Sequence, residues 1–312
     1  MKVHESVFLS EAIEGLCVSP GDSVVDATIG GAGHFGALLA KLEGKGTLIG
    51  IDADADAVAR GKEVAKNAGG VRVEVVEGNF RNLGAILDEH GIEEVSAVLF
   101  DLGWSSYHLS SGRGFSFRVD EPLLMTYGAP EMGKTAADVV NSASEEALSD
   151  IIHSLGEERF ARAIARGIVR ARSTKHIIST SDLVDVILAS TPSWYHNRRI
   201  HPATKTFQAL RIYVNDELGA LRDGLTGALS HLSEGGRVAV ITFHSIEDRI
   251  VKTMFRDAAH EGKGTLITKK PVEPSLEERN ANPRARSAKL RIFERCSKNR
   301  DSVESFATYA YA

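Results

Sequence analysis

The sequence has very few cysteines, because Cys17 and Cys296 are the only two among 312 residues. They show no metal-ligand spacing, and so few cysteines indicate a reducing compartment. We therefore expect a cytoplasmic protein without a metal site. The sequence also lacks an apolar run long enough to span a membrane, and Met1 to Glu5 have no signal-peptide pattern. These absences argue against secreted, membrane-spanning and disulfide-rich proteins.

An overall excess of positive charge is also absent, because the net charge is −5. The positive charge is instead concentrated in two segments. Ten Lys/Arg and two Asp/Glu lie between Arg159 and Arg211, and fourteen Lys/Arg and six Asp/Glu lie between Arg249 and Arg300. An acidic chain that gathers its basic residues in this way is typical of proteins that bind a polyanion. The alternative is a set of solvated helix faces whose charges pair with acids elsewhere.

The arginine spacing in the first basic segment predicts a helix face. Arg159, Arg162, Arg166 and Arg170 recur at steps of three and four residues, which places them on one side of a helix. The candidate RNA-binding residues are Arg159, Arg162, Arg166, Arg198, Arg199, Lys205, Arg284 and Arg286.

Short apolar runs alternate with helical patterns in the first hundred residues. This alternation predicts an α/β fold with a mostly parallel sheet. The expected strands are Val24–Asp26, Thr47–Asp52, Val71–Val76 and Val95–Asp101. The expected helices are Leu9–Leu16, Phe35–Leu42, Ala55–Asn67 and Leu83–His90.

The alternation stops near Gly112 and resumes after Asn215. The stretch between them has helical patterns and no strong strand, so we expect residues 112–213 to form an inserted helical, substrate-binding domain. Residues 1–111 and 214–312 would form the main domain. The helices expected after residue 112 are Thr135–Leu155, Glu157–Arg172, Ser181–Ala189, Asp216–Leu232 and Ile246–Ala258. The expected later strands are Arg237–Phe243 and two antiparallel ones near Thr265–Ile267 and Ala288–Glu294.

A glycine-rich turn follows the first expected strand. Gly30, Gly31 and Gly33 lie between Asp26 and a helical pattern, where a ligand can approach the backbone closely. Asp52 ends the next strand, roughly 20 residues further on, at the spacing of a ribose-binding carboxylate. The structural alternatives are a tight turn and a helix N-cap at Asp52. Both NAD and S-adenosylmethionine (SAM) carry such a ribose, and the Gly-Gly-Ala-Gly order disfavours a pyrophosphate site.

The fourth expected strand ends in Asp101, which is followed by Leu102, Gly103 and Trp104. An acid followed by two linker residues and an aromatic is similar to the Asp-Pro-Pro-Tyr motif of amino-group methyltransferases. A carboxylate that accepts an N–H from an exocyclic amine localises the nitrogen lone pair for attack, and an aromatic can stack on the base. The alternatives are a strand-end cap for Asp101 and a core position for Trp104.

Several longer blocks together resemble the RsmH (MraW) family of SAM-dependent methyltransferases of 16S ribosomal RNA. The resemblance runs from about His4 to Cys296. The matching blocks are Asp26–His34, Asp101–Ser106, Arg113–Phe117, Glu157–Arg162, His201–Arg211, Phe243–Arg249 and Asn282–Ser287.

This resemblance implies a class I SAM-dependent methyltransferase with a Rossmann-like, mostly parallel seven-stranded sheet and a helical insertion. It implies N4-methylation of a cytidine in the decoding centre, with small-subunit rRNA or the 30S subunit as partner and the protein as a monomer or homodimer. The implied SAM-binding residues are Ala32, Gly33, His34, Asp52, Phe80, Asp101 and His108. The candidate catalytic residues are Asp101 and Trp104.

The chain departs from the family pattern near the expected site. Trp104 stands where the family usually has Val, and His108 where it has Gln. Leu124 and Thr126 replace an acid and an arginine of the family block Gly-Pro-Leu-Asp-Met-Arg. Three alternatives follow: a divergent paralogue that methylates another RNA cytidine, a non-catalytic RNA-binding assembly factor, and a dinucleotide-dependent oxidoreductase. Glycine spacing opposes the last.

Three histidines are further candidates. His34 follows the glycine turn, His244 ends the fifth expected strand, and His201 lies in the first basic segment. Because methyl transfer to an amine needs no strong base beforehand, a structural hydrogen-bonding role is the more common use of each.

Overall fold

The computed structural model describes residues 6–103, 111–127 and 133–296. The chain divides into two compact units. The first, here called the core unit, combines Met1–Leu102 with Arg222–Ala312, and the second, the helical unit, is Gly103–Leu221.

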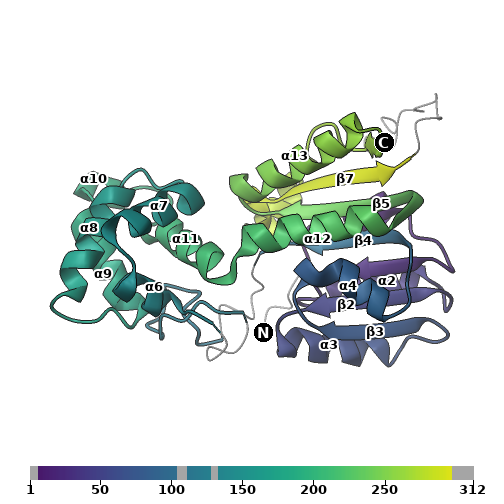
Figure 1. Ribbon diagram of the computed structural model, residues 1–312, viewed down its shortest axis with the longest axis horizontal. Helices are drawn as coiled ribbons and strands as arrows, with labels where there is room; N and C mark the ends of the chain where they lie inside the picture. The colour runs from purple at the N-terminus through teal and green to yellow at the C-terminus, as the bar shows by residue number, and fades with distance from the viewer. Residues whose placement is uncertain (1–5, 104–110, 128–132, 297–312) are drawn as a thin grey trace. The chain divides into compact units, whose positions relative to one another are not determined.

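A seven-stranded sheet forms the centre of the core unit, from β3 at the bottom to β7 near the top of Figure 1. Its order is β3-β2-β1-β4-β5-β7-β6, in which β1 to β5 are parallel and β7 is antiparallel to both β5 and β6. This mixed order confirms the predicted class I, Rossmann-like methyltransferase fold. The strands are β1 Ser23–Asp26, β2 Thr47–Asp52, β3 Arg72–Glu77, β4 Val95–Asp101, β5 Leu232–Thr242, β6 Gly264–Leu266 and β7 Lys289–Arg295.

Strand β5 begins earlier than the expected start at Arg237. It starts at Leu232, and its pairing with β4 shifts register between Val95 and Ala97. Gly235 sits in that irregular stretch with φ +77°, a conformation that favours glycine. Gly235 and Gly236, which precede the expected start, therefore lie within the strand at this irregularity.

The helices expected in the core unit are present in the predicted order, whereas α14 was not predicted. Apolar residues of α1, α2 and the central strands share one buried cluster, which includes Phe8, Phe35 and Leu38. Helix α2 begins at Gly33, two residues before the expected start. These helices and 3-10 turns are α1 Leu9–Leu16, α2 Gly33–Lys41, α3 Ala55–Ala65, η1 Phe80–Asn82, α4 Leu83–Glu89, α12 Glu217–His231, α13 Ser245–His260, α14 Leu276–Ala281 and η3 Pro283–Ser287, of which α12 starts in the helical unit.

The helical unit has its own hydrophobic core, in which Leu148, Ile164 and Leu210 are fully buried. The single helix expected over Thr135–Leu155 was wrong, because the structure has two helices there. Ser144 caps the second one, since its side chain accepts from the backbone N–H of Ala147. Helix α11 was not predicted from the sequence. The helices are α6 Ala136–Ser142, α7 Glu145–Gly156, α8 Ala161–Arg172, α9 Thr180–Ser190, α10 Ser193–His196 and α11 Ala203–Asn215.

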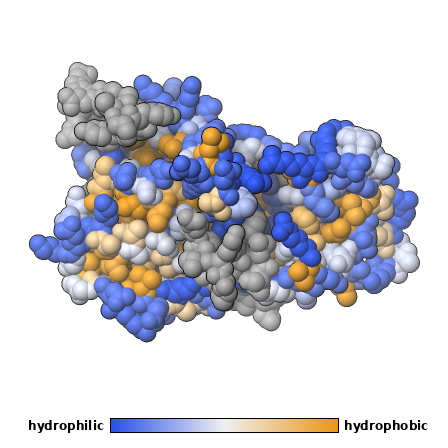
Figure 2. Space-filling model, turned by 180° about the vertical axis from the view of Figure 1, so that it is seen from behind, coloured by the Kyte–Doolittle hydropathy of each residue, from blue (hydrophilic) through white to orange (hydrophobic). Residues whose placement is uncertain are grey.

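Among the described residues, no helix combines the length and apolar character needed to cross a membrane. The face drawn in Figure 2 is a mixture of hydrophilic and hydrophobic residues.

Candidate active site

Three aspartates meet at one edge of the sheet in the core unit. Asp26, Asp52 and Asp101 are the last residues of β1, β2 and β4, three adjacent parallel strands. Asp26 is level with Gly50 and Leu99, so Asp52 and Asp101 each extend two residues beyond it. The carboxyl ends of parallel strands are the usual place for a ligand in this type of fold.

The glycine-rich turn is tied to both neighbouring strands. Gly30 has φ +49° and donates its N–H to Oδ2 of Asp52, while its carbonyl oxygen accepts from Nε of Arg60. Ala32, the N-cap of α2, also has a left-handed backbone with φ +63°. A Cβ at Gly33 would lie 2.3 Å from Oγ of Ser6, so any larger residue there would require the Ser6 side chain to move.

Asp52 links two loops. Its Oδ1 accepts from the N–H of Asp54 and its Oδ2 from that of Gly30, both at 2.9 Å. The helix N-cap of α3 is Asp54, so the alternative reading of Asp52 as that cap was wrong. Burial raises the pKa of Asp52, and the two backbone hydrogen bonds oppose this shift.

Asp101 is fixed by its backbone and paired through its side chain. Its N–H donates to Oγ1 of Thr28 at 2.7 Å, which joins the end of β4 to the turn after β1. Its Oδ2 lies 3.5 Å from Nδ1 of His34, whereas Oδ1 is buried without a hydrogen-bond partner among the described residues. A buried carboxylate oxygen left open in this way is an acceptor available to a ligand.

Asp26 was not proposed as a site residue from the sequence, although it directly precedes the glycine-rich turn. It is fully buried; its Oδ1 accepts from the N–H of Thr28, and its Oδ2 has no partner in the part of the chain that the structure describes. Burial raises the pKa of Asp26 to about 7, against the opposing effect of nearby His34. An acid at a strand end before a glycine turn is the signal that could have identified it.

His34 interacts electrostatically with both carboxylates and is 3% exposed. Burial lowers its pKa, but the hydrogen bond and charge of Asp101 and the charge of Asp26 outweigh this effect, so the pKa of His34 is raised. Its Nε2 is buried, and no described residue forms a hydrogen bond with it. Asp26, His34 and Asp101 form one electrostatically coupled group, named here the buried triad.

The buried triad fits the chemistry of SAM. Within the described residues, Oδ2 of Asp26 is an open acceptor, and SAM carries an ammonium group that donates hydrogen bonds. Asp52, on the adjacent strand, ends at the level where ribose hydroxyls are bound in related folds.

Three other site residues were predicted in the core unit or beside it, and the structure describes one of them. Phe80 is half-buried in η1 and packs edge-on against Phe100, with ring centroids 5.6 Å apart. Trp104 and His108 lie outside the described residues.

The two arginines expected to bind RNA in the second basic segment differ from each other. Arg284 is half-buried, with its guanidinium 5.7 Å from the ring centre of Phe243. Burial lowers the pKa of Arg284, and the charge of Asp101 opposes this shift. Arg286, by contrast, is exposed. Arg284 therefore contributes positive charge to the buried triad.

In the helical unit, Arg162, Arg166 and Arg170 are placed on α8, as the spacing predicted, and Arg162 and Arg166 are exposed. The expectation for Arg159 was wrong, because α8 begins at Ala161 and Arg159 precedes the helix. The remaining candidates Arg198 and Arg199 are exposed after α10, while Lys205 donates to the carbonyl oxygen of Glu157 at 2.7 Å.

His244 and His201 have structural contacts. His244 is the N-cap of α13 and forms a capping box with Glu247. His201 stacks on Phe117 with centroids 4.8 Å apart, and its Nδ1 accepts from the N–H of Ala203.

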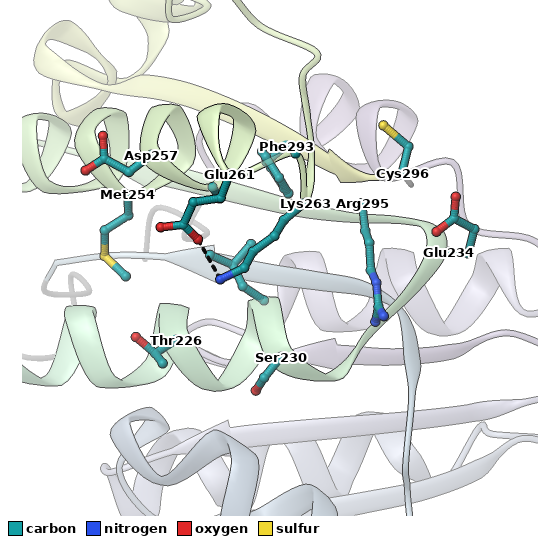
Figure 3. Close-up of a pocket in the computed structure, with 13 residues that line it drawn as sticks. Thr226, Ser230, Glu234, Met254, Asp257, Glu261, Lys263, Phe293, Arg295 and Cys296 are labelled. Atoms are coloured by element: carbon teal, nitrogen blue, oxygen red, sulfur yellow. Dashed lines mark ion pairs between the residues drawn. The ribbon is translucent and has the colours of Figure 1, made fainter. Parts of the chain in front are cut away.

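A pocket of about 720 Å³ lies elsewhere in the core unit. Figure 3 shows Thr226 and Ser230 on one helix facing residues of α13, with Arg295 and Cys296 at the end of β7. Its wall includes Glu234 near the start of β5, whereas Asp101 pairs with Ile241 near the end of that strand. The pocket is therefore at the opposite end of the sheet from the buried triad.

Comparison with known proteins gives consistent matches. The model of the MraW methylase family matches residues 1–296. The protein named Ribosomal RNA small subunit methyltransferase H in Deinococcus deserti is 46% identical over 296 residues, which cover 94% of this chain and 93% of its own length. Its namesake in Heliobacterium modesticaldum is 44% identical over 310 residues, with 94% and 98% covered. A crystal structure described as a putative rRNA-methylase from Clostridium thermocellum aligns at 15% identity and a TM-score of 0.46, with 93% and 98% covered.

Proposed function

The chain belongs to the MraW methylase family, and on that premise we propose that it methylates N4 of a cytidine in the decoding centre of small-subunit ribosomal RNA. The coarser assignment, a SAM-dependent methyltransferase of small-subunit rRNA, follows from the family and from the relatives' names. The observation that carries the finer proposal is the open, buried Oδ1 of Asp101 at the carboxyl end of β4.

SAM supplies a methyl group bound to a positively charged sulfur. The side chains proposed to hold it are Asp52 for the ribose, Phe80 beside the adenine, and the turn residues Ala32, Gly33 and His34. Asp26, whose Oδ2 has no partner among the described residues, joins this set from the structure. His108 stays a prediction from the family resemblance.

Asp101 is proposed to orient the nucleophile. The amine of cytosine is a poor nucleophile because its lone pair is delocalised into the ring, and a carboxylate that accepts an N–H counteracts this. No described residue donates a hydrogen bond to Oδ1 of Asp101. The backbone N–H of Asp101 donates to Oγ1 of Thr28, which fixes the end of the strand. Orientation of this kind lowers the barrier mainly by placing N4 and removing water.

His34 supports the proposed proton acceptor. Bound SAM would supply the methyl group, and N4 would lose one proton on methylation. Asp101 is the proposed acceptor, and His34, whose Nδ1 lies 3.5 Å from Oδ2, orients its carboxylate. Trp104 stays a prediction as the residue that stacks on the target cytosine.

The helical unit, residues 103–221, is proposed to hold the RNA. Exposed Arg162 and Arg166 on α8, with Arg198 and Arg199, are suited to phosphates, and phosphate contacts position a nucleic acid without reading its sequence. We further propose that the protein is cytoplasmic. It would act, as a monomer or a homodimer, on the 30S subunit or its rRNA.

The changed loop supports a second candidate, a divergent paralogue or a non-catalytic assembly factor. Thr126, where the family has an arginine, is 6% exposed, its Oγ1 has no partner among the described residues, and Leu124 is half-buried. Neither side chain offers the charge that an acid and an arginine would have given to bound RNA.

Nucleoside analysis of small-subunit rRNA tests the proposal. Ribosomal RNA from cells with and without the gene is digested, and N4-methylcytidine is measured by mass spectrometry and mapped. We expect the modified nucleoside to disappear from one position and to return after treatment with the purified protein and SAM. Loss of a different modification would identify the paralogue, and no change at any position would favour the assembly factor.

A further inference from the structure

The helical unit exposes a large aromatic side chain in its basic segment. Trp194 on α10 is 49% exposed, although tryptophan is usually among the most buried residues on average. An indole in water needs an explanation, and its neighbours provide one.

Two guanidinium groups lie against this indole. The carbon Cζ of Arg159 is 4.7 Å from the ring centre of Trp194, and Cζ of Arg198 is 5.4 Å from it. Both distances are within the range of a cation–π interaction. Arg159 and Arg198 come from segments almost forty residues apart in sequence, so the fold assembles this arrangement.

Ring packing and hydrogen bonds hold the base of the cluster together. Phe160 and Tyr195 pack edge-on against Trp194 with ring centroids 5.9 Å away in both cases. The hydroxyl of Tyr195 donates to Oε2 of the fully buried Glu158 at 2.7 Å, and Oε1 of Glu158 accepts from the N–H of Phe160 at 2.8 Å. Both carboxylate oxygens of Glu158 therefore accept hydrogen bonds within the cluster. The outer surface of the cluster carries aromatic and positive groups.

We propose that Trp194, with Arg159 and Arg198, forms a platform on which an unpaired base of the RNA substrate stacks. The proposal rests on the proposed function and adds a contact that neither the family match nor the arginine pattern assigns. Arg198 has the longer contact with the ring, and it turns to a flanking phosphate when the base stacks. Exposed Arg199 adds charge beside it. Stacking on an aromatic and phosphate neutralisation are the two terms that hold single strands.

The charge of the cluster favours RNA over a protein partner. Arg159, Arg198 and Arg199 surround an exposed ring in a segment that contains ten Lys/Arg and two Asp/Glu. A polyanion with flat π faces matches both properties at once. A protein partner would need both an acidic patch and an apolar one.

The test compares RNA binding by Trp194→Ala with binding by a control, Ile200→Ala. Ile200 is 60% exposed in the same segment, so its removal also takes away exposed apolar surface. The probes are a fluorescein-labelled single-stranded oligocytidine and an RNA duplex of the same length. We expect Trp194→Ala to weaken single-strand binding about tenfold and duplex binding less than twofold, because the variant no longer stacks on one base. Ile200→Ala should change neither.

Intrinsic fluorescence gives a second readout. In a Trp104→Phe background Trp194 is the only tryptophan, and single-stranded RNA should quench its emission. Equal losses on single strand and duplex, no loss on either, or no quenching would each overturn the platform. Binding of isolated small-subunit proteins that depends on Trp194, with RNA affinity unchanged, would identify a protein site and also overturn it.

Failure of the platform and failure of the proposed function remain distinguishable. The binding experiment uses no SAM and no methyl transfer, so it reports on the platform alone. If the wild type does not methylate cytidine, the proposed function fails whatever Trp194 does. If it does, Trp194→Ala should raise the half-saturating RNA concentration.

Discussion

The core unit and the helical unit use charge in opposite ways. The core unit buries Asp26 and His34 and leaves Oδ2 of the first and Nε2 of the second without partners among the described residues. The helical unit exposes several arginines, such as Arg162 and Arg166 on α8 and Arg198 beside an exposed indole. Buried, unpaired groups are costly to the fold and suit a small ligand that completes them, whereas exposed arginines suit a large anion.

From this contrast we propose that the chemistry belongs to the core unit and RNA binding to the helical unit. Changes in the buried triad or at Asp52 should therefore alter rates and SAM affinity. Changes on the helical unit should alter RNA affinity and its dependence on salt.

The largest expected effect follows from Asp101→Ala. Removing the carboxylate takes away the acceptor for the amine, and we expect single-turnover methylation to fall by about a hundredfold or more at saturating SAM and RNA. Asp88→Ala is the matched control, since that carboxylate is exposed and pairs with His231. An Asp101→Ala enzyme with near-normal rate would remove Asp101 from the chemistry.

Asp52→Ala should act on SAM affinity. Loss of a charged acceptor for ribose hydroxyls is worth roughly 1.5–3 kcal/mol, so calorimetric titration should show binding weakened by about ten- to a hundredfold. Asp54→Ala removes a neighbouring carboxylate that caps α3. It should lower Tm and leave SAM affinity nearly unchanged. Equal affinity in a folded Asp52→Ala protein would contradict the ribose role.

Reversal of Arg162 and Arg166 to Glu should weaken RNA binding about tenfold at moderate salt and leave SAM affinity unchanged. Because the variant no longer neutralises two phosphates, the slope of log affinity against log salt should flatten by about 1.4. Lys62 and Lys66 of the core unit have the same four-residue spacing, and their double reversal is the control. An unchanged slope in the α8 variant would show that this face does not contact RNA.

The last expected effect is on stability, from Asp26→Asn. Because burial raises the pKa of Asp26 from 3.8 to about 7, the folded protein holds this proton between those values and the unfolded chain does not. The free energy of unfolding of the wild type therefore decreases as pH rises from 4 to 7. The asparagine variant lacks this decrease.

With ~1.4 kcal/mol per pKa unit, Asp26→Asn should raise Tm by several degrees at pH 8 and by less at pH 5, measured without SAM. The charges that face Asp26 are His34, Asp101 and Asp52, and all three remain in the variant. A Tm difference that does not depend on pH would show that Asp26 is ionised throughout.

Much of the core unit could be predicted from the sequence because its signals are local. Thr47–Asp52 and Val95–Asp101 have the same bounds in the structure, since an apolar run that ends in an acid marks a buried parallel strand and its carboxyl end. Helix α11 was missed because its residues were read as a basic block, and Arg211, although charged, is buried against Glu217.

The parts that could not be predicted depend on contacts between distant residues. The coupling of Asp26 to His34 and Asp101 needs the parallel order of β1 and β4. The arginine–tryptophan platform needs Arg159 and Trp194 to meet through packing within the helical unit. No spacing rule in the sequence connects either pair.

The most direct test of the division between the two units is single-turnover methylation measured as a function of RNA concentration, with SAM saturating. The Asp101→Ala enzyme should have a lower maximal rate with an unchanged half-saturating RNA concentration. The enzyme with Arg162 and Arg166 reversed should have an unchanged maximal rate and a half-saturating concentration raised about tenfold. If both variants changed the same parameter, the separation of chemistry in the core unit from RNA binding in the helical unit would be wrong.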